Sequence, residues 1–228
     1  TCKKIRLLYK YFSVCLFYTL NYTTMPLFTI DSAIERASTL PAKFYTDKDI
    51  FEQLKYQVFA RSWQWICDAD VVKLQGDVYP FNFLDGFVDE PLLFTHDERG
   101  EIHCLSNVCT HRGNILVKNA GNAQQLQCGY HGRRFGLNGD FKHMPGTQGM
   151  ENFPSATDSL PKAPFKKWFN FLFASINPAY DFEIVIDDIE ARVGWMPVKD
   201  FRFDASRSQD YLVKANWAFS LIERMLIH

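Results

Sequence analysis

The chain carries Cys109-Thr-His111 and Cys128-Gly-Tyr-His131, two Cys/His pairs separated by residues 112–127. Each pair offers one soft thiolate and one imidazole within a few residues of chain. A Cys and a His this close together on a tight loop can point the same way, but they cannot close a tetrahedron round one metal ion. Each pair therefore supplies half of the ligands of a larger object, and the fold must bring the two halves together.

Two thiolates and two imidazoles are the ligands of a binuclear iron–sulfur centre in which histidines replace cysteines on one iron. In such a 2Fe-2S cluster, Cys109 and Cys128 would hold one iron, and His111 and His131 would hold the other. Three glycines lie in or beside the pairs, where a missing side chain lets the backbone bend and approach the sulfurs: Gly113, Gly129 and Gly132.

A structural zinc site could use the same four residues. Zinc modules usually space their ligands as C-x2-4-C with H-x3-5-H, and neither pair has that spacing. Buried inert cysteines with ordinary surface histidines are the usual explanation for a single Cys or His. Four such residues in this arrangement favour the iron–sulfur cluster over both alternatives.

The two motifs resemble the cluster signature of the Rieske non-haem iron oxygenases, in particular the α subunits of aromatic-ring-hydroxylating and related oxygenases. The resemblance rests on Asn107-Val-Cys-Thr-His-Arg-Gly-Asn114 and on Cys128-Gly-Tyr-His-Gly-Arg-Arg-Phe-Gly-Leu-Asn-Gly139, and it extends from about Leu40 to Trp217. It implies a Rieske 2Fe-2S cluster that accepts electrons and passes them to a separate mononuclear non-haem Fe(II), where oxygen is activated. Neither loop has an extra Cys for the loop-tying disulfide of respiratory-chain Rieske proteins, which favours the oxygenase and ferredoxin type.

The chain departs from this family at Arg133 and Arg134, because the family usually has Trp directly after the Gly that follows the second His. A fixed positive charge near the cluster would favour its reduced form and raise its potential. Alternatively, it could pair with a carboxylate on a partner protein. The third alternative is that both arginines are solvated and have no role.

A second departure concerns the mononuclear iron. In the family, a segment like Tyr211-Leu-Val-Lys-Ala-Asn-Trp217 continues into a helix with an acidic residue and two closely spaced histidines, and a later carboxylate completes the site. Here only Glu223 and His228 follow as candidate ligands, and an i, i+5 pair does not share a helical face. We therefore expect a truncated, catalytically incomplete chain to which no catalytic residue is assigned.

Composition agrees with part of a globular redox enzyme. A hydrophobic content of 47% and an aromatic content of 16% suffice for a sizeable core. The net charge of −1 gives no indication of nucleic acid or an anionic membrane surface as a partner. The cysteines outside the two motifs show no framework spacing, which argues against a disulfide scaffold: Cys2, Cys15, Cys67 and Cys104.

Residues 1–24 differ in character from the rest of the chain. Basic residues precede a short apolar run at 11–18, which superficially suggests a signal peptide, but the run is too short to span a membrane and no A-x-A-like cleavage site comes after it. Met25 begins the part that resembles the family. We interpret 1–24 as a translated upstream or non-native segment rather than a targeting segment.

Local patterns predict a helix and then mostly strands. Thr46 is a plausible N-cap, and the apolar residues after it recur at helical spacing: Ile50, Phe51, Leu54, Val58 and Phe59. Short β-rich runs follow at 63–67, 78–83, 92–95 and 102–105. Asn138-Gly139 is a hairpin signal, and 168–176 is the most apolar strand. Residues 180–190 suit a short helix or a connector, and 202–217 are expected to form strands of the catalytic domain.

The sequence therefore predicts an α+β chain. Residues 25–60 are an N-terminal helical segment, 61–180 a small antiparallel β Rieske domain, and 181–228 a connector with the truncated start of a catalytic domain. Its function would be one-electron transfer within an O2-dependent ring-hydroxylating or related oxygenase. The alternatives are a stand-alone Rieske ferredoxin-type electron carrier and a zinc-stabilised binding module.

The same resemblance implies the partners. A reductase or ferredoxin would supply electrons, and a small organic substrate would bind in the full-length enzyme. We expect a cytoplasmic protein with no nucleic-acid or membrane partner, and the family suggests a homotrimer in which electrons cross between subunits.

Overall fold

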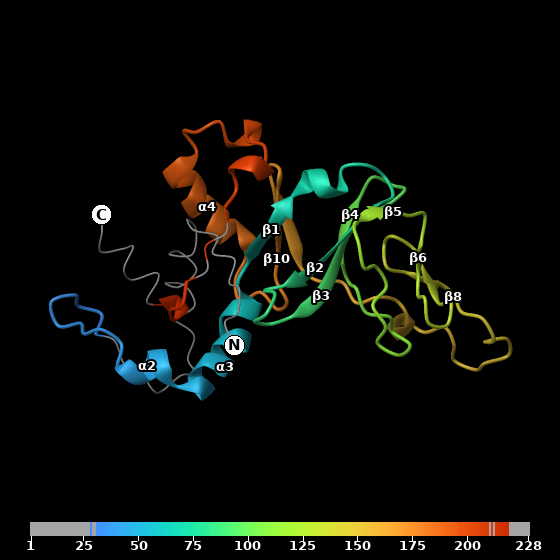
Figure 1. The fold of residues 1–228 in the computed structure, drawn as a ribbon, viewed down its shortest axis with the longest axis horizontal. Helices are drawn as coiled ribbons and strands as arrows, with labels where there is room; N and C mark the ends of the chain where they lie inside the picture. The colour runs from blue at the N-terminus through green and yellow to red at the C-terminus, as the bar shows by residue number, and fades with distance from the viewer. Residues whose placement is uncertain (1–27, 29–30, 210, 212, 219–228) are drawn as a thin grey trace.

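The computed structural model describes residues 28, 31–209, 211 and 213–218. The segment 1–24 and the two C-terminal candidate ligands, Glu223 and His228, lie outside these residues. The described part combines helices with antiparallel sheets, which confirms the predicted α+β class (Figure 1).

Three antiparallel sheets make up the β structure of the described residues. The first has the order β1-β10-β9, at Gln64–Asp68, Phe171–Ala174 and Phe165–Trp168. The central sheet has the order β4-β3-β2-β5, at Ile102–Ser106, Glu90–His96, Asp77–Phe83 and Gly121–Asn122. The third has the order β6-β7-β8, at Leu126–Gln127, Arg134–Phe135 and Phe141–His143. The strands predicted before residue 106 are therefore all present, each within two residues of its predicted bounds.

The helices are α2 at Ala42–Thr46, α3 at Lys48–Gln57 and α4 at Phe182–Val193. Short 3-10 helices lie at Phe59–Arg61, Ala69–Val72, Ala156–Asp158, Val198–Asp200 and Ala205–Arg207. In Figure 1, α2, α3 and α4 lie at the opposite end of the molecule from β6 and β8, with the central sheet between them.

The central sheet is buried on both faces. Successive side chains of a strand point to opposite sides, so one strand contributes to two cores. Leu92 and Phe94 of β3 enter a core shared with Leu172 of β10. Leu93, between them, enters a second core with Phe135 of β7. The second core also contains Cys109 and Cys128, so this sheet supports the two Cys/His loops directly.

The predicted N-terminal helix is present, but it begins one residue later than expected. Its N-cap is Asp47 and not Thr46, because the Asp47 carboxylate accepts hydrogen bonds from the backbone N–H groups of Asp49 and Ile50 at 2.9 and 3.2 Å. Thr46 ends the preceding helix α2. In the apolar stripe Ile50, Leu54 and Phe59 are buried, and the other two residues are partly buried. The stripe packs with Trp217, whose ring centroid lies 5.1 Å from that of Phe59.

The prediction of a single strand over 168–176 is wrong. This run contains the last residue of β9, a turn and the strand β10, which together form a hairpin. Strand β9 ends at Trp168 and pairs there with Phe171 of β10, which leaves only Phe169 and Asn170 to make the turn. Phe169 is half-exposed and has a φ of +48°. The sequence hides this reversal, because the first position of the turn, with its positive φ, carries an aromatic residue where Gly, Asn or Asp is usual, and Asn170 alone interrupts the apolar run 168–174.

The strands predicted for 202–217 are absent from the described residues of that range. The chain instead forms the 3-10 helix Ala205–Arg207, where the Asp204 carboxylate accepts a hydrogen bond from the backbone N–H of Ser206. That local side-chain bond offers the backbone an alternative to strand pairing. Residues 180–190, in contrast, do fall largely within a helix, α4, which buries Phe182 and Val185 against Trp63.

The Asn138-Gly139 turn is also present and joins β7 to β8. Gly139 has a φ of +87°, and a Cβ there would meet the Leu105 side chain at 2.9 Å, so this position requires glycine on both grounds. None of the helices within the described residues is long and apolar enough to cross a membrane.

Replacing Leu93 with Ala should destabilise the fold by about 2–5 kcal/mol, because Leu93 is fully buried and its loss leaves a cavity beneath the Cys/His loops. Urea unfolding measures this free energy. The matched control is Leu74→Ala, whose side chain is 65% exposed and which should change stability by less than about 0.5 kcal/mol. Equal losses for the two variants would contradict the position given to β3.

Candidate metal centre

The first Cys/His pair lies on a loop that follows strand β4. Cys109 is 2% exposed, and its backbone N–H donates to the carbonyl of Asn114 at 2.8 Å. The N–H of Gly113 donates back to the Cys109 carbonyl at 3.0 Å. Gly113 has a φ of +68°, in the left-handed region that side chains disfavour. These two hydrogen bonds close a tight loop around the pair.

The second pair lies on a loop between β6 and β7 that closes in the same way. Cys128 is 3% exposed and its N–H donates to the carbonyl of Arg133, five residues on, at 2.8 Å. Gly132, four residues after the cysteine, donates to the Cys128 carbonyl at 3.1 Å and has a φ of +72°. Both cysteines therefore occupy the same place in equivalent turns, although the histidines follow at different spacings. Gly129 has no positive φ and no crowded Cβ position, so nothing here requires glycine at that residue.

The two loops also contact each other. The side-chain amide of Asn114 on the first loop donates to the Sγ of Cys128 on the second at 3.7 Å. The imidazole rings of His111 and His131 lie with their centroids 4.8 Å apart, at an interplanar angle of 71°. The structure thus brings all four predicted ligands to one place, from two loops.

The donor set of two thiolates and two imidazoles suits an iron–sulfur cluster with histidines on one iron. Nδ1 of His131 is buried and has no hydrogen-bond partner, which a buried imidazole nitrogen rarely tolerates unless it binds something. Among the described residues, the only group of three candidate ligand atoms within 4.8 Å of one another is Asp97, Glu101 and His103.

The Asp97, Glu101 and His103 group has a structural explanation. Asp97 closes the turn between β3 and β4, where its carboxylate accepts from the backbone N–H groups of Arg99 and Glu101, both at 2.9 Å. Its other oxygen pairs with Nε2 of His103 at 2.8 Å. These hydrogen bonds already occupy both oxygens of the buried Asp97 carboxylate, which accounts for the group without a metal ion.

The thiols divide into two kinds. Burial raises the pKa of Cys67 to about 12 and raises that of Cys104 even further. Burial also raises the pKa of Cys109. For Cys128 burial is outweighed by donors to its sulfur, namely the backbone N–H groups of Tyr130 and His131 and the Asn114 amide, which hold its pKa below the usual value. Metals bind thiolates, so the second loop presents its sulfur in the more suitable state.

The histidines lie between the core and the surface. Both are half-buried, and the ring of Tyr130, 59% exposed, lies over His131 with centroids 3.7 Å apart. Burial, His131 and the nearby arginines, Arg133 among them, hold the pKa of His111 below its usual value. A neutral imidazole is the form that binds a metal.

Arg133 and Arg134 have opposite environments, so the alternative in which both are solvated is wrong. Arg134 is exposed. Arg133 is 3% exposed, and its Nη2 donates to the carboxylate of Asp158 and, at 3.1 Å, to the Asp158 carbonyl. The carboxylate that pairs with Arg133 therefore belongs to its own chain and not to a partner.

Sequence reasoning missed Asp158, because it lies in a stretch that looks like an irregular loop. The signal available was Ser155-x-x-Asp158, the spacing of a capping box. The structure contains that box, with the Asp158 carboxylate accepting from the backbone N–H of Ser155 at 2.7 Å. Asp158 also contacts the first loop, since Oγ1 of Thr110 donates to its carbonyl at 2.8 Å.

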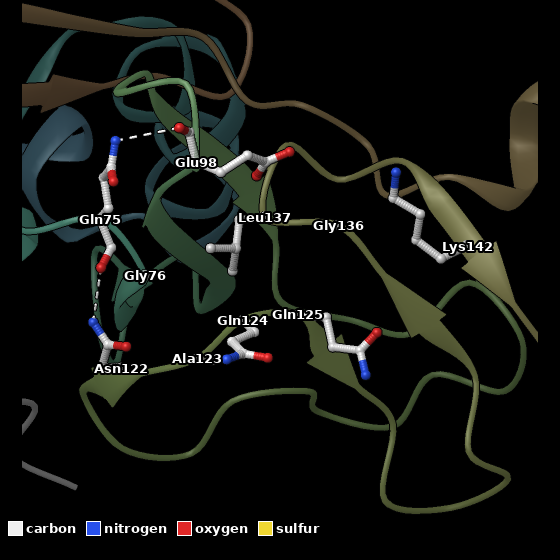
Figure 2. A pocket seen from close by; sticks show the side chains of 10 residues that line it. All are labelled: Gln75, Gly76, Glu98, Asn122, Ala123, Gln124, Gln125, Gly136, Leu137 and Lys142. Carbon is white, nitrogen blue, oxygen red and sulfur yellow. Dashed lines mark hydrogen bonds between the residues drawn. The ribbon is translucent and has the colours of Figure 1, made fainter.

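An open groove lies away from the Cys/His loops, beside β5 and β6 (Figure 2). Amide side chains line much of it, and two of them are held by neighbouring backbone. Gln75 donates to the carbonyl of Glu98 at 3.2 Å, and Asn122 donates to the carbonyl of Gln75 at 3.0 Å. None of the four predicted ligands lines this groove.

Part of the chain, including both Cys/His loops, is similar to known proteins. Residues 62–154 match the family model of the Rieske [2Fe-2S] domain. Over 146 residues the chain is 32% identical to the carnitine monooxygenase oxygenase subunit of Escherichia coli (strain K12), covering 63% of this chain and 38% of that protein. It is 31% identical to the chlorobenzene dioxygenase subunit alpha of Cupriavidus sp. (strain PS12), covering 59% of this chain and 27% of that protein.

A solved structure has the same fold. The crystal structure of a quaternary ammonium Rieske monooxygenase matches 68% of this chain and 42% of its own chain, with a TM-score of 0.60 and 24% identity. The chain therefore spans about two fifths or less of the length of these relatives. The matches confirm the resemblance to Rieske oxygenases and the predicted 2Fe-2S cofactor.

Asp158 should make a pH-dependent contribution to the free energy of unfolding. The backbone N–H of Ser155 and then Arg133 lower its pKa, so the unfolded chain binds a proton more tightly than the folded one. The stability it adds is therefore full above the unfolded pKa of about 3.9 and is lost as the pH falls through the lower folded pKa. At pH 6.5 we expect Asp158→Asn to be less stable by about 1–3 kcal/mol.

Urea unfolding of both metal-free proteins, at pH 6.5 and at about pH 3, measures that difference without contribution from an acid-labile cluster. The difference should shrink at the lower pH. A difference that stays constant would show that Asp158 stabilises the fold without its charge.

Proposed function

We propose that residues 62–154, which match the Rieske [2Fe-2S] domain model, bind a 2Fe-2S cluster in which Cys109 and Cys128 hold one iron and His111 and His131 hold the other. The observation that carries this assignment is the pair of equivalent turns that present all four side chains at one place. The unpartnered Nδ1 of His131 supports it, because iron would satisfy that buried nitrogen.

The cluster would supply one-electron transfer when bound. The chain's own residues provide the environment for that step. The two cysteines lie within the apolar core, whereas the two histidines are only half-buried, and the exposed ring of Tyr130 lies over His131. Electrons would enter and leave on the histidine side, where a protein partner can approach.

We place this chain in an O2-dependent ring-hydroxylating or related oxygenase, as the part that passes electrons from a reductase or ferredoxin to a mononuclear iron. The iron and the small organic substrate would be bound outside the residues that the structure describes. The two relatives compared by sequence are the oxygenase subunit of a monooxygenase and the alpha subunit of a dioxygenase, which supports an oxygenase component over a stand-alone electron carrier.

Protein produced with iron and sulfide should be red-brown and, once reduced, should give the anisotropic paramagnetic signal of a binuclear cluster with inequivalent irons. Cys109→Ser and Cys128→Ser should each abolish assembly. The matched control is Cys67→Ser, a buried cysteine outside the loops, which should still assemble the cluster. Metal analysis that returns one zinc and no acid-labile sulfide would contradict the assignment.

His131→Cys should either prevent assembly or leave a cluster of lower potential, because a thiolate adds negative charge where a neutral imidazole stood. Redox titration followed by visible absorption measures the potential. His143→Cys makes the same substitution at an exposed residue of β8 and should leave the potential unchanged. An unaltered potential in His131→Cys would remove His131 from the ligand set.

A further inference from the structure

We propose that Arg133 and Asp158 form a buried charge pair beside the metal centre, in which each charge shifts the reduction potential and is compensated by the other. The proposal rests on the cluster assignment above. It gives opposite electrostatic roles to two residues that are not ligands.

The pair is fixed in position by contacts on every side. Three aromatic rings surround the Arg133 guanidinium, whose central carbon lies 4.9 Å from the ring centroid of Phe141 and 5.7 Å from those of Phe135 and Phe153. Its Nε is buried and has no hydrogen-bond partner. Rings attract a cation but screen it far less than water does, so the charge of Arg133 acts over a longer distance than that of an exposed arginine.

Asp158 holds Arg133 beside both ligand loops. Its carbonyl accepts from Nη2 of Arg133, two residues after His131, and from Oγ1 of Thr110, which stands between Cys109 and His111. One residue of the chain therefore bridges the loops that carry all four proposed ligands. The charges of Arg133 and Asp158 lie on that bridge and are held at a constant distance from the centre.

The effect of each charge on the reduction potential follows from the negative charge that reduction adds to the centre. Reduction transfers one electron from the donor, a reductase or ferredoxin in the proposed function, and adds one negative charge to the centre with no proton required. Arg133 favours the reduced state, and Asp158 opposes it. Removing one charge leaves the other uncompensated, so the two single substitutions must shift the potential in opposite directions. A merely structural pair would instead weaken cluster binding in both variants, with no opposed shift.

The test is redox titration of the cluster-loaded chain with dithionite and mediators, together with its paramagnetic signal and acid-labile sulfide content. Arg133→Gln should lower the potential and Asp158→Asn should raise it, each changing the ratio of oxidised to reduced cluster by about tenfold, or about 59 mV for a one-electron couple. The double variant should return toward the wild-type value, because it removes one charge of each sign.

Arg134→Gln is the matched control, since it removes the same charge one residue further on from an exposed side chain. It should leave the potential unchanged. Shifts of the same sign in Arg133→Gln and Asp158→Asn, or no shift in either, would overturn the proposal. If Arg133→Gln does not retain a cluster, Asp158→Asn decides alone: a raised potential supports the pair, and an unchanged or lowered one refutes it.

The two proposals fail in different ways. Wild-type protein without acid-labile sulfide would contradict the cluster assignment and the charge pair with it. If the wild-type protein assembles the cluster but neither Arg133→Gln nor Asp158→Asn changes its potential, only the charge pair is contradicted.

Discussion

The burial of strand β3 on both faces is the constraint on which the rest of the structure depends. Leu92 and Phe94 point into one core and Leu93 into the other, so a slip of one residue would exchange the two cores. Neighbouring strands β2 and β4 hold β3 in register along its length. Since Cys109 and Cys128 are members of the second core, the same register that packs the sheet also positions the thiols.

The two Cys/His loops form the same turn, although the spacing between Cys and His differs between them. In each, the cysteine N–H bonds to the carbonyl five residues on, and a glycine four residues on bonds back to the cysteine carbonyl. The histidine occupies a variable place within this constant frame, at the third residue of the first motif and the fourth of the second. These hydrogen bonds set the same turn in both loops, and the two imidazoles meet with an interplanar angle of 71°.

Much of this arrangement could be predicted from sequence because its signals are local. The spacing of the four proposed ligands, the early strands, the stripe of the N-terminal helix and the Asn138-Gly139 turn all depend on residues near one another in the chain. The failures have different causes. The turn at 169–170 begins with an aromatic residue, Phe169, and the hydrogen bond at Asp204 competes with strand formation over 202–217. The role of Arg133 depends on Asp158, a partner 25 residues away that no periodicity reveals.

The cysteines outside the loops have a consequence for how the centre is built. Cys67 and Cys104 lie in the first core, where burial keeps their thiols protonated at any physiological pH. A protonated thiol is a poor ligand and a poor nucleophile. Of the four cysteines in the described part of the chain, Cys67 and Cys104 are therefore poor competitors for iron and sulfide. Their burial in the apolar interior disfavours incorrect sulfur ligation while the cofactor is assembled.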